Sequence, residues 1–175
     1  DWDELGKLRL PDWDNPERYS HLPEVYKGQA DYYNTAWIPG FPFSLMRKMR
    51  KMENFLMDIV IEKENVEKLN EKIVELLLGV IDNYGQVGAD SIFFCEDWGL
   101  QDRLLIHPDL WREMFKPSFK VLCDCAKENG LKVFMHSCGK IESFIPDFIE
   151  AGIDVLQALQ ANTGMDVVKL KEKYG

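Results

Sequence analysis

Two short apolar runs in the second half of the chain constrain its fold more than any other feature. Residues 91–95 and 131–136 consist mainly of apolar side chains and are bounded by polar ones. Runs of this length and composition indicate strands that are buried on both faces, as in a parallel sheet. A helical pattern separates them. Pro108 suits the first turn of a helix, Pro117 is expected to kink or restart it, and it continues to Asn129 and stops at Gly130.

The alternation of strand and helix extends beyond these two runs. Residues 62–84 show the clearest helical stripe of apolar side chains, and residues 43–58 have the spacing of a single helix. Residues 31–38 and 153–156 have the composition of further strands, and a last helix is predicted over residues 166–174. Strands and helices that alternate through short connections predict an α/β fold with about four parallel strands.

The number of strands bears on domain organisation. A complete (β/α)8 TIM barrel takes roughly 250 residues, and this chain has 175. We therefore expect residues 30–175 to be the middle portion of such a barrel, incomplete at both ends. Residues 1–29 are rich in Pro, Asp and Trp, which predicts an extended wrapping segment. Because an open half-barrel would expose apolar sheet edges, a homo-oligomer is a further expectation.

The composition argues against several classes of partner. The formal net charge of -9 at pH 7 disfavours nucleic acid and anionic membrane surfaces. No apolar run approaches the roughly 20 residues of a membrane helix, and the first residues do not have the pattern of a secretory signal. The four cysteines do not form a disulfide-scaffold pattern, so we expect a reducing, cytoplasmic setting.

Polar residues follow three of the predicted strands at the points where those strands end. They are Glu96, Asp97 and Gln101 after the strand at 91–95, His136 and Cys138 at the end of the strand at 131–136, and Gln157 and Gln160 after the strand at 153–156. In parallel α/β folds the chemistry lies at the C-terminal ends of the strands. We therefore expect these side chains, which come from separate βα units, to gather in one site.

The most specific pair among them is His136 and Cys138, which stand two residues apart in a turn. An imidazole and a thiol can hold a soft metal such as zinc, which prefers nitrogen and sulfur donors. A tetrahedral site needs further ligands, so the pair alone is also compatible with a purely structural role. Glu96 and Asp97 are open to two interpretations as well, because they could belong to the site or cap the helix that follows.

The turn that contains this pair reads Phe-Met-His-Ser-Cys-Gly-Lys-Ile over residues 134–141, and a helix and a strand follow it at residues 145–157. This stretch resembles the uroporphyrinogen decarboxylase superfamily, and within it the corrinoid- and coenzyme M-linked methyltransferases and O-demethylase components. The resemblance covers most of residues 30–175. It is supported by residues 96–101, 108–111 and 171–175 and, more loosely, by residues 50–58.

The resemblance implies a (β/α)8 barrel enzyme that works with a metal. In the methyltransferase branch a zinc ion is held by the His and Cys of this motif, here His136 and Cys138, and by one more Cys, which would lie beyond residue 175. Zinc would deprotonate a substrate thiol, which would take a methyl group from a corrinoid carried by a partner protein. The methyl donor or acceptor could also be a small molecule.

The remaining strand-end residues would assist in this scheme. Glu96 or Asp97 would be catalytic, by orienting a ligand, by hydrogen bonding to a metal ligand or by completing the metal sphere. Gln101, Gln157 and Gln160 would contact the substrate. We expect this fragment to be inactive alone.

Two other functions stay open. One is a uroporphyrinogen decarboxylase-like lyase of porphyrin biosynthesis, which would act on a tetrapyrrole without a metal. The arginine-rich N-terminal segment with which that branch of the superfamily grips carboxylates is not found in this sequence. The other is a non-catalytic fragment or binding module that keeps the fold and has lost the chemistry.

Overall fold

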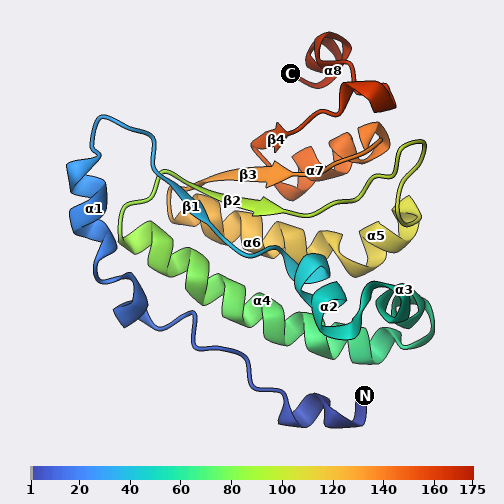
Figure 1. Ribbon diagram of the computed structural model, residues 1–175, viewed down its shortest axis with the longest axis horizontal. Coiled ribbons are helices and arrows are strands. Elements are labelled where there is room, and N and C mark those ends of the chain that lie inside the picture. Colours follow the sequence, from blue (N-terminus) through green and yellow to red (C-terminus); the bar gives the residue numbers. More distant parts are fainter. Residues whose placement is uncertain (1) are drawn as a thin grey trace.

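The computed structural model describes residues 2–175, and a parallel sheet lies at its centre (Figure 1). The strands are β1 (Thr35–Trp37), β2 (Ser91–Cys95), β3 (Lys132–His136) and β4 (Val155–Gln157). They lie in the order β1-β2-β3-β4, and every neighbouring pair is parallel. The predicted α/β fold with about four parallel strands is therefore confirmed. The first strand is shorter than the predicted 31–38.

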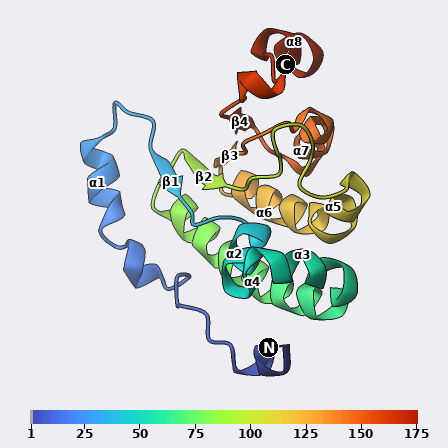
Figure 2. The same cartoon turned by 45° about the vertical axis from the view of Figure 1, so that its right-hand side comes forward.

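Two long helices, α4 (Lys63–Gln86) and α6 (Lys116–Glu128), lie side by side on one face of the sheet (Figures 1 and 2). Alternate strand residues point to opposite faces. Those that face the helices form the core with them, and they include Ile92, Phe94, Val133 and Met135, all fully buried. The opposite face is open, and its Trp37 side chain is 61% exposed. The predicted homo-oligomer stays a prediction.

The remaining helices connect the strands or follow them. They are α1 (Leu22–Gly28), α2 (Pro42–Arg50), α3 (Met52–Ile61), α5 (Pro108–Met114), α7 (Ile145–Ala151) and α8 (Val167–Tyr174). Short 3-10 helices lie at Trp2–Lys7, Pro16–Tyr19, Glu142–Phe144 and Ala161–Thr163. Pro residues occupy the first turn of α2, α5, α6 and α7, where a missing N–H leaves no helical hydrogen bond unmade.

The helical structure predicted over residues 43–58 is confirmed, but two helices occupy this stretch instead of one. Lys51 separates them with φ 62° and ψ 143°, values outside the helical region. Contacts across the break hold the two helices together. The Nε atom of Arg50 donates to Asp58 at 2.8 Å, and the rings of Phe43 and Phe55 lie 5.4 Å apart.

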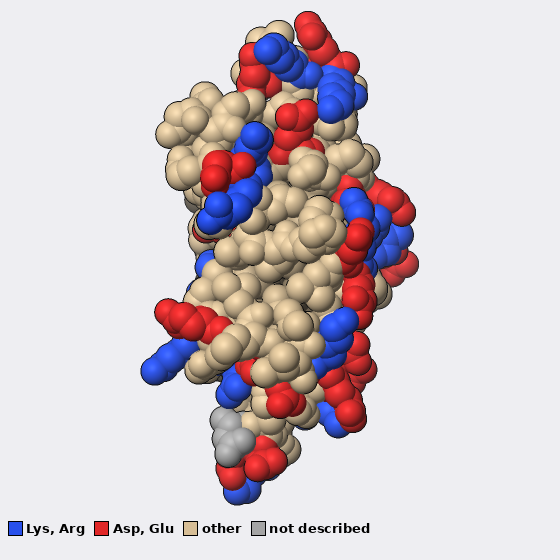
Figure 3. All heavy atoms as spheres, turned by 90° about the vertical axis from the view of Figure 1, so that its right-hand side faces the viewer, with Lys and Arg blue, Asp and Glu red and all other residues tan. Residues whose placement is uncertain are grey.

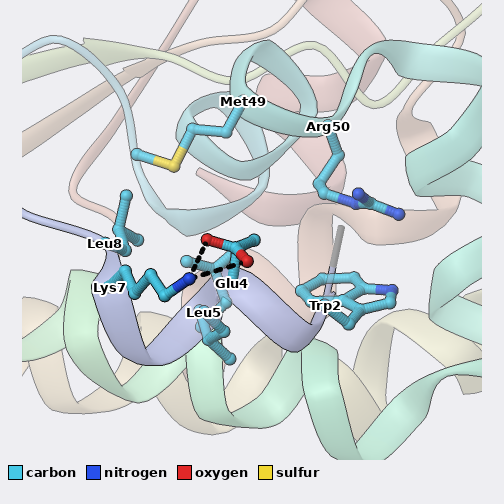
Figure 4. Close-up of a pocket in the computed structure, with 8 residues that line it drawn as sticks. Trp2, Glu4, Leu5, Lys7, Leu8, Met49 and Arg50 are labelled. Carbon is cyan, nitrogen blue, oxygen red and sulfur yellow. Dashed lines mark hydrogen bonds and ion pairs between the residues drawn. The ribbon is translucent and has the colours of Figure 1, made fainter.

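The N-terminal segment, residues 2–29, runs along α4 (Figure 1). The amide of Asn83 on α4 donates to the carbonyl of Asp14 at 2.7 Å, and the rings of Tyr19 and Tyr84 meet edge to face at 5.0 Å. At its start the segment reaches α2, where the guanidinium of Arg50 lies 4.3 Å from the Trp2 ring (Figure 4). The predicted extended wrapping segment stays a prediction, and the segment contains two 3-10 helices and α1.

The end of the molecule toward which the strands point has an uncharged centre (Figure 3). Acidic and basic side chains lie mostly around its border. Met57, Val60 and Ile61 on α3 are among the exposed apolar residues of the protein.

Within residues 2–175, each helix is too short or too polar to cross a lipid bilayer.

Candidate metal centre

Three potential metal ligands converge where β2 and β3 end. Asp97 follows β2, His136 is the last residue of β3, and Cys138 lies in the turn after it. The Nε2 atom of His136 lies 3.1 Å from Cys138 Sγ and 3.7 Å from Asp97 Oδ1. One ligand atom from each residue lies within 4.8 Å of the other two. Nitrogen, sulfur and carboxylate oxygen are all donors that zinc accepts, so the set fits that metal.

Pairing between β2 and β3 sets this arrangement. Cys95 is the ladder partner of His136, and the N–H of Glu96 donates to the carbonyl of His136 at 2.9 Å. Beyond the strands, the side chain of Ser137 turns inward and its Oγ accepts a hydrogen bond from the N–H of Trp98 at 3.0 Å. The two loops are thereby joined, and the ligands on either side of Ser137 face Asp97.

Asp97 is tied directly to the turn that carries the thiol. Its Oδ1 atom accepts a hydrogen bond from the backbone N–H of Cys138 at 2.9 Å. Burial raises the pKa of the Cys138 thiol, and the negative charge of Asp97 raises it further. A bound divalent cation would reverse this effect, because it favours the thiolate. The electrostatics of the site therefore favour a bound cation.

Gln157, at the end of β4, holds the imidazole. Its Oε1 atom accepts a hydrogen bond from Nδ1 of His136. Because an amide oxygen only accepts, this hydrogen bond requires a proton on Nδ1, and it leaves Nε2 facing Cys138 and Asp97. Gln157 was predicted to contact the substrate, and the structure places it behind the histidine instead. Contact with a substrate stays a prediction.

The other two predicted glutamines lie on the far side of the turn. The Oε1 atom of Gln160 accepts a hydrogen bond from the N–H of Gly139 at 2.9 Å, and its amide donates to Gln101 at 3.4 Å. The structure thus brings Gln101 and Gln160 to the loop that carries Cys138. Their contact with a substrate also stays a prediction.

The side chain of Glu96 does not lie with those of Asp97, His136 and Cys138. Its side chain is fully buried on the opposite side of the chain from Asp97, where it accepts hydrogen bonds from the N–H groups of Phe41 (2.9 Å) and Ser44 (3.3 Å). Burial raises its pKa to about 8, although these N–H groups lower it. Glu96 therefore caps the start of α2. The helix that follows Glu96 and Asp97 in sequence, α5, is capped by the side chain of His107.

Cys95 was not among the residues selected from the sequence. As the ladder partner of His136 it lies on the same face of the sheet. Burial raises the pKa of its thiol, and the charges of Asp97 and Cys138 add to the effect. Counting alternate residues back from Asp97 along β2 would have found it.

Comparisons with known proteins give one family and one fold. A family model described as Uroporphyrinogen decarboxylase (URO-D) matches residues 15–173. Among solved structures, a methyltransferase from Methanosarcina mazei is similar at a TM-score of 0.66 and 14% sequence identity. The similarity covers 84% of this chain and 44% of that one, so this chain spans less than half of that protein's length. A search of curated proteins gives no match.

Proposed function

Because the chain belongs to the uroporphyrinogen decarboxylase family, we propose that it carries the metal-binding part of a methyltransferase. The reaction would transfer a methyl group between a corrinoid protein, or a small-molecule donor, and a thiol or other acceptor. The observation that carries the proposal is the convergence of Asp97, His136 and Cys138 at the C-terminal end of a parallel sheet. The methyltransferase from Methanosarcina mazei supports it as a protein of the same fold.

His136 and Cys138 would hold a zinc ion. Bound zinc would supply a Lewis acid that favours the thiolate form of a substrate thiol at neutral pH. The protein's own contribution is to position the donors. Gln157 fixes the tautomer of His136, and the hydrogen bond from the Cys138 N–H holds the Asp97 carboxylate beside the turn. Free thiols at all four cysteines support a reducing, cytoplasmic setting for this chemistry.

A second candidate is a decarboxylase that acts on a tetrapyrrole without a metal. The description of the matching family model favours it, since that model covers residues 15–173. In this case the Asp97 carboxylate, whose side chain is 41% exposed, would bind the substrate and His136 would be a neutral hydrogen-bonding group. A non-catalytic module would keep the same sheet and need neither activity.

Metal analysis separates these candidates. We expect the purified chain to hold one zinc per molecule, and His136→Ala and Cys138→Ala to lose it. Cys125→Ser is the matched control, because this thiol lies on α6 and contacts Asp82 at 3.3 Å. A folded chain that binds no zinc would contradict the proposal, and decarboxylation of uroporphyrinogen would favour the second candidate. Both activities should also be assayed in any longer protein that contains this chain.

A further inference from the structure

We propose that Asp97 is a protein ligand of the metal in place of the later Cys that the resemblance implies, so that Asp97, His136 and Cys138 form a three-ligand site with an open fourth position. The inference rests on the proposed function and deepens it. It takes the third ligand from residues that the structure already brings together. Two ligands would bind a metal weakly, whereas three that are held in place make a site of catalytic type.

The two distances from His136 Nε2 to the other donor atoms agree with this assignment. Zinc bond lengths in a tetrahedral site place nitrogen and sulfur ligands roughly 3.5 Å apart and nitrogen and oxygen ligands roughly 3.4 Å apart. The corresponding distances here are 3.1 Å from His136 Nε2 to Cys138 Sγ and 3.7 Å from His136 Nε2 to Asp97 Oδ1. Both differ from a tetrahedral site by less than about 0.5 Å, which small side-chain rotations can supply.

The carboxylate is already oriented for this role. The hydrogen bond from the Cys138 N–H to Asp97 Oδ1 joins one ligand's backbone to the other's side chain. A carboxylate oxygen has two lone pairs, so it can accept this N–H and still face a metal ion. Hydrogen bonds to ligating carboxylates are a usual feature of the shell around metal sites.

Charge favours the same set. With His136 neutral, the Cys138 thiolate and the Asp97 carboxylate together balance a divalent cation. His136 and Cys138 alone would leave a net positive charge in a partly buried place, which is costly without a partner. The side chains of His136 and Asp97 are 23% and 41% exposed. The fourth position would therefore be open to a substrate from the solvent side.

The test compares substitutions at residue 97 in the purified chain. Asp97→Asn keeps an oxygen that accepts the Cys138 N–H but removes the charge, so it separates ligation from positioning of the turn. We expect it to weaken zinc binding, measured by chelator competition, by more than about 100-fold, which exceeds the effect of losing an outer-shell partner. Circular dichroism checks that the variant is folded.

A second variant gives a spectroscopic readout. Asp97→Cys replaces the oxygen donor by a thiolate, so in the cobalt(II)-loaded chain the thiolate-to-metal charge-transfer absorption should rise about two-fold. Asp102→Cys is the matched control, because Asp102 lies on the same loop, outside the three-ligand cluster, and its side chain is 74% exposed. It should leave the absorption unchanged.

Three results would overturn the inference, and they differ in what else they affect. Unchanged zinc affinity in Asp97→Asn, with unchanged absorption in Asp97→Cys, would leave a site of His136 and Cys138 only. Zinc loss in Cys95→Ser with full retention in Asp97→Asn would assign the third ligand to Cys95. Failure of the unsubstituted chain to bind zinc or cobalt would overturn the proposed metal chemistry as well.

Discussion

Gly99 and Gly139 lie against each other, so that neither position has room for a side chain. A Cβ atom on Gly99 would lie 2.6 Å from the carbonyl oxygen of Cys138, and one on Gly139 would collide with the backbone of Gly99. Gly139 also has φ +83°, in the left-handed region that favours glycine. Because the loops after β2 and β3 touch through their backbones, Asp97 stays beside Cys138.

Substitution of Gly139 should therefore cost more than the change of backbone conformation alone. We expect Gly139→Ala to lower the free energy of unfolding by about 1–2 kcal/mol for the left-handed conformation and by a further ~1–3 kcal/mol for the collision. Gly88→Ala is the control, because Gly88 has φ +85° and no atom within 4 Å of an added Cβ. Denaturant unfolding of both variants measures the difference. Equal losses would show that the loops can separate at no cost.

The buried Glu96 should make stability depend on pH. Its pKa is raised from 4.5 to about 8, mainly by burial, with Arg47 and the N–H groups of α2 opposing the shift. Between these two values the folded state keeps a proton that the unfolded state has lost. This contribution to the free energy of unfolding is therefore complete below about pH 4.5 and is lost as pH rises to about 8.

Glu96→Gln removes this ionisation and keeps an oxygen that accepts from the start of α2. The stability difference between the unsubstituted chain and the variant, measured by thermal unfolding from about pH 5 to about pH 9, should shift against the unsubstituted chain as pH rises. A shift in the opposite direction would mean that the N–H groups of Phe41 and Ser44 keep the carboxylate ionised.

Gln157 should affect metal affinity without contacting the metal. In Gln157→Ala the imidazole of His136 loses the acceptor that fixes its tautomer, so zinc affinity should fall by about 10- to 100-fold. Gln86→Ala, at the exposed end of α4, is the control and should leave affinity unchanged. Chelator competition at fixed pH measures both. An affinity that does not change in Gln157→Ala would show that the turn alone orients the histidine.

The helices behind the site depend on one buried carboxylate. Asp147, in the first turn of α7, accepts hydrogen bonds from Arg112 on α5 and Lys116 on α6 at 2.8–3.1 Å. Burial acts to raise its pKa, but these two cations lower it below 3.8 overall. We expect Asp147→Asn to reduce the free energy of unfolding by about 1–3 kcal/mol at neutral pH.

The sign of the pH effect follows from the lowered pKa of Asp147. Its contribution is present above pH 3.8 and is lost as pH falls through the folded-state value, so the variant and the unsubstituted chain should converge in acid. Asp109→Asn is the control, because Asp109 binds the same Arg112 at 2.8 Å from an exposed position and should matter little. Urea unfolding near neutral pH and near pH 3 tests both expectations.

Much of the fold could be predicted because it depends on local patterns. Strand β2 occupies the predicted residues 91–95, since polar residues bound its apolar run. The stripe of apolar residues over 62–84 likewise predicts the bounds of α4 to within about two residues. The break at Lys51 could not be predicted, because the apolar spacing continues across it and lysine has no preference for positive φ. Tertiary contacts such as Arg50 with Asp58 hold it.

The site could be predicted in outline but not in its internal arrangement. Asp97, His136 and Cys138 could be assigned to one site because the chemistry of parallel α/β folds lies at the C-terminal ends of the strands. Successive side chains point to opposite faces along β2, and continuing this alternation past its end places Glu96 on the opposite side from Asp97. The same alternation predicts that Glu96 is buried when Asp97 faces the site. The pairing of Gln157 with His136 depends on the register of β3 and β4, which no local pattern in either strand specifies.

The row of Cys95, His136 and Gln157 crosses three strands in register. Neighbouring strands lie about 4.8 Å apart, so the backbone spacing within this row is set by the hydrogen-bond ladder and not by the side chains. Exchanging a side chain in the row therefore changes the chemical group beside the His136 imidazole while the backbone positions stay fixed. Substitutions at residues 95 and 157 could be used to change the surroundings of the imidazole on either side without moving the strand that carries it.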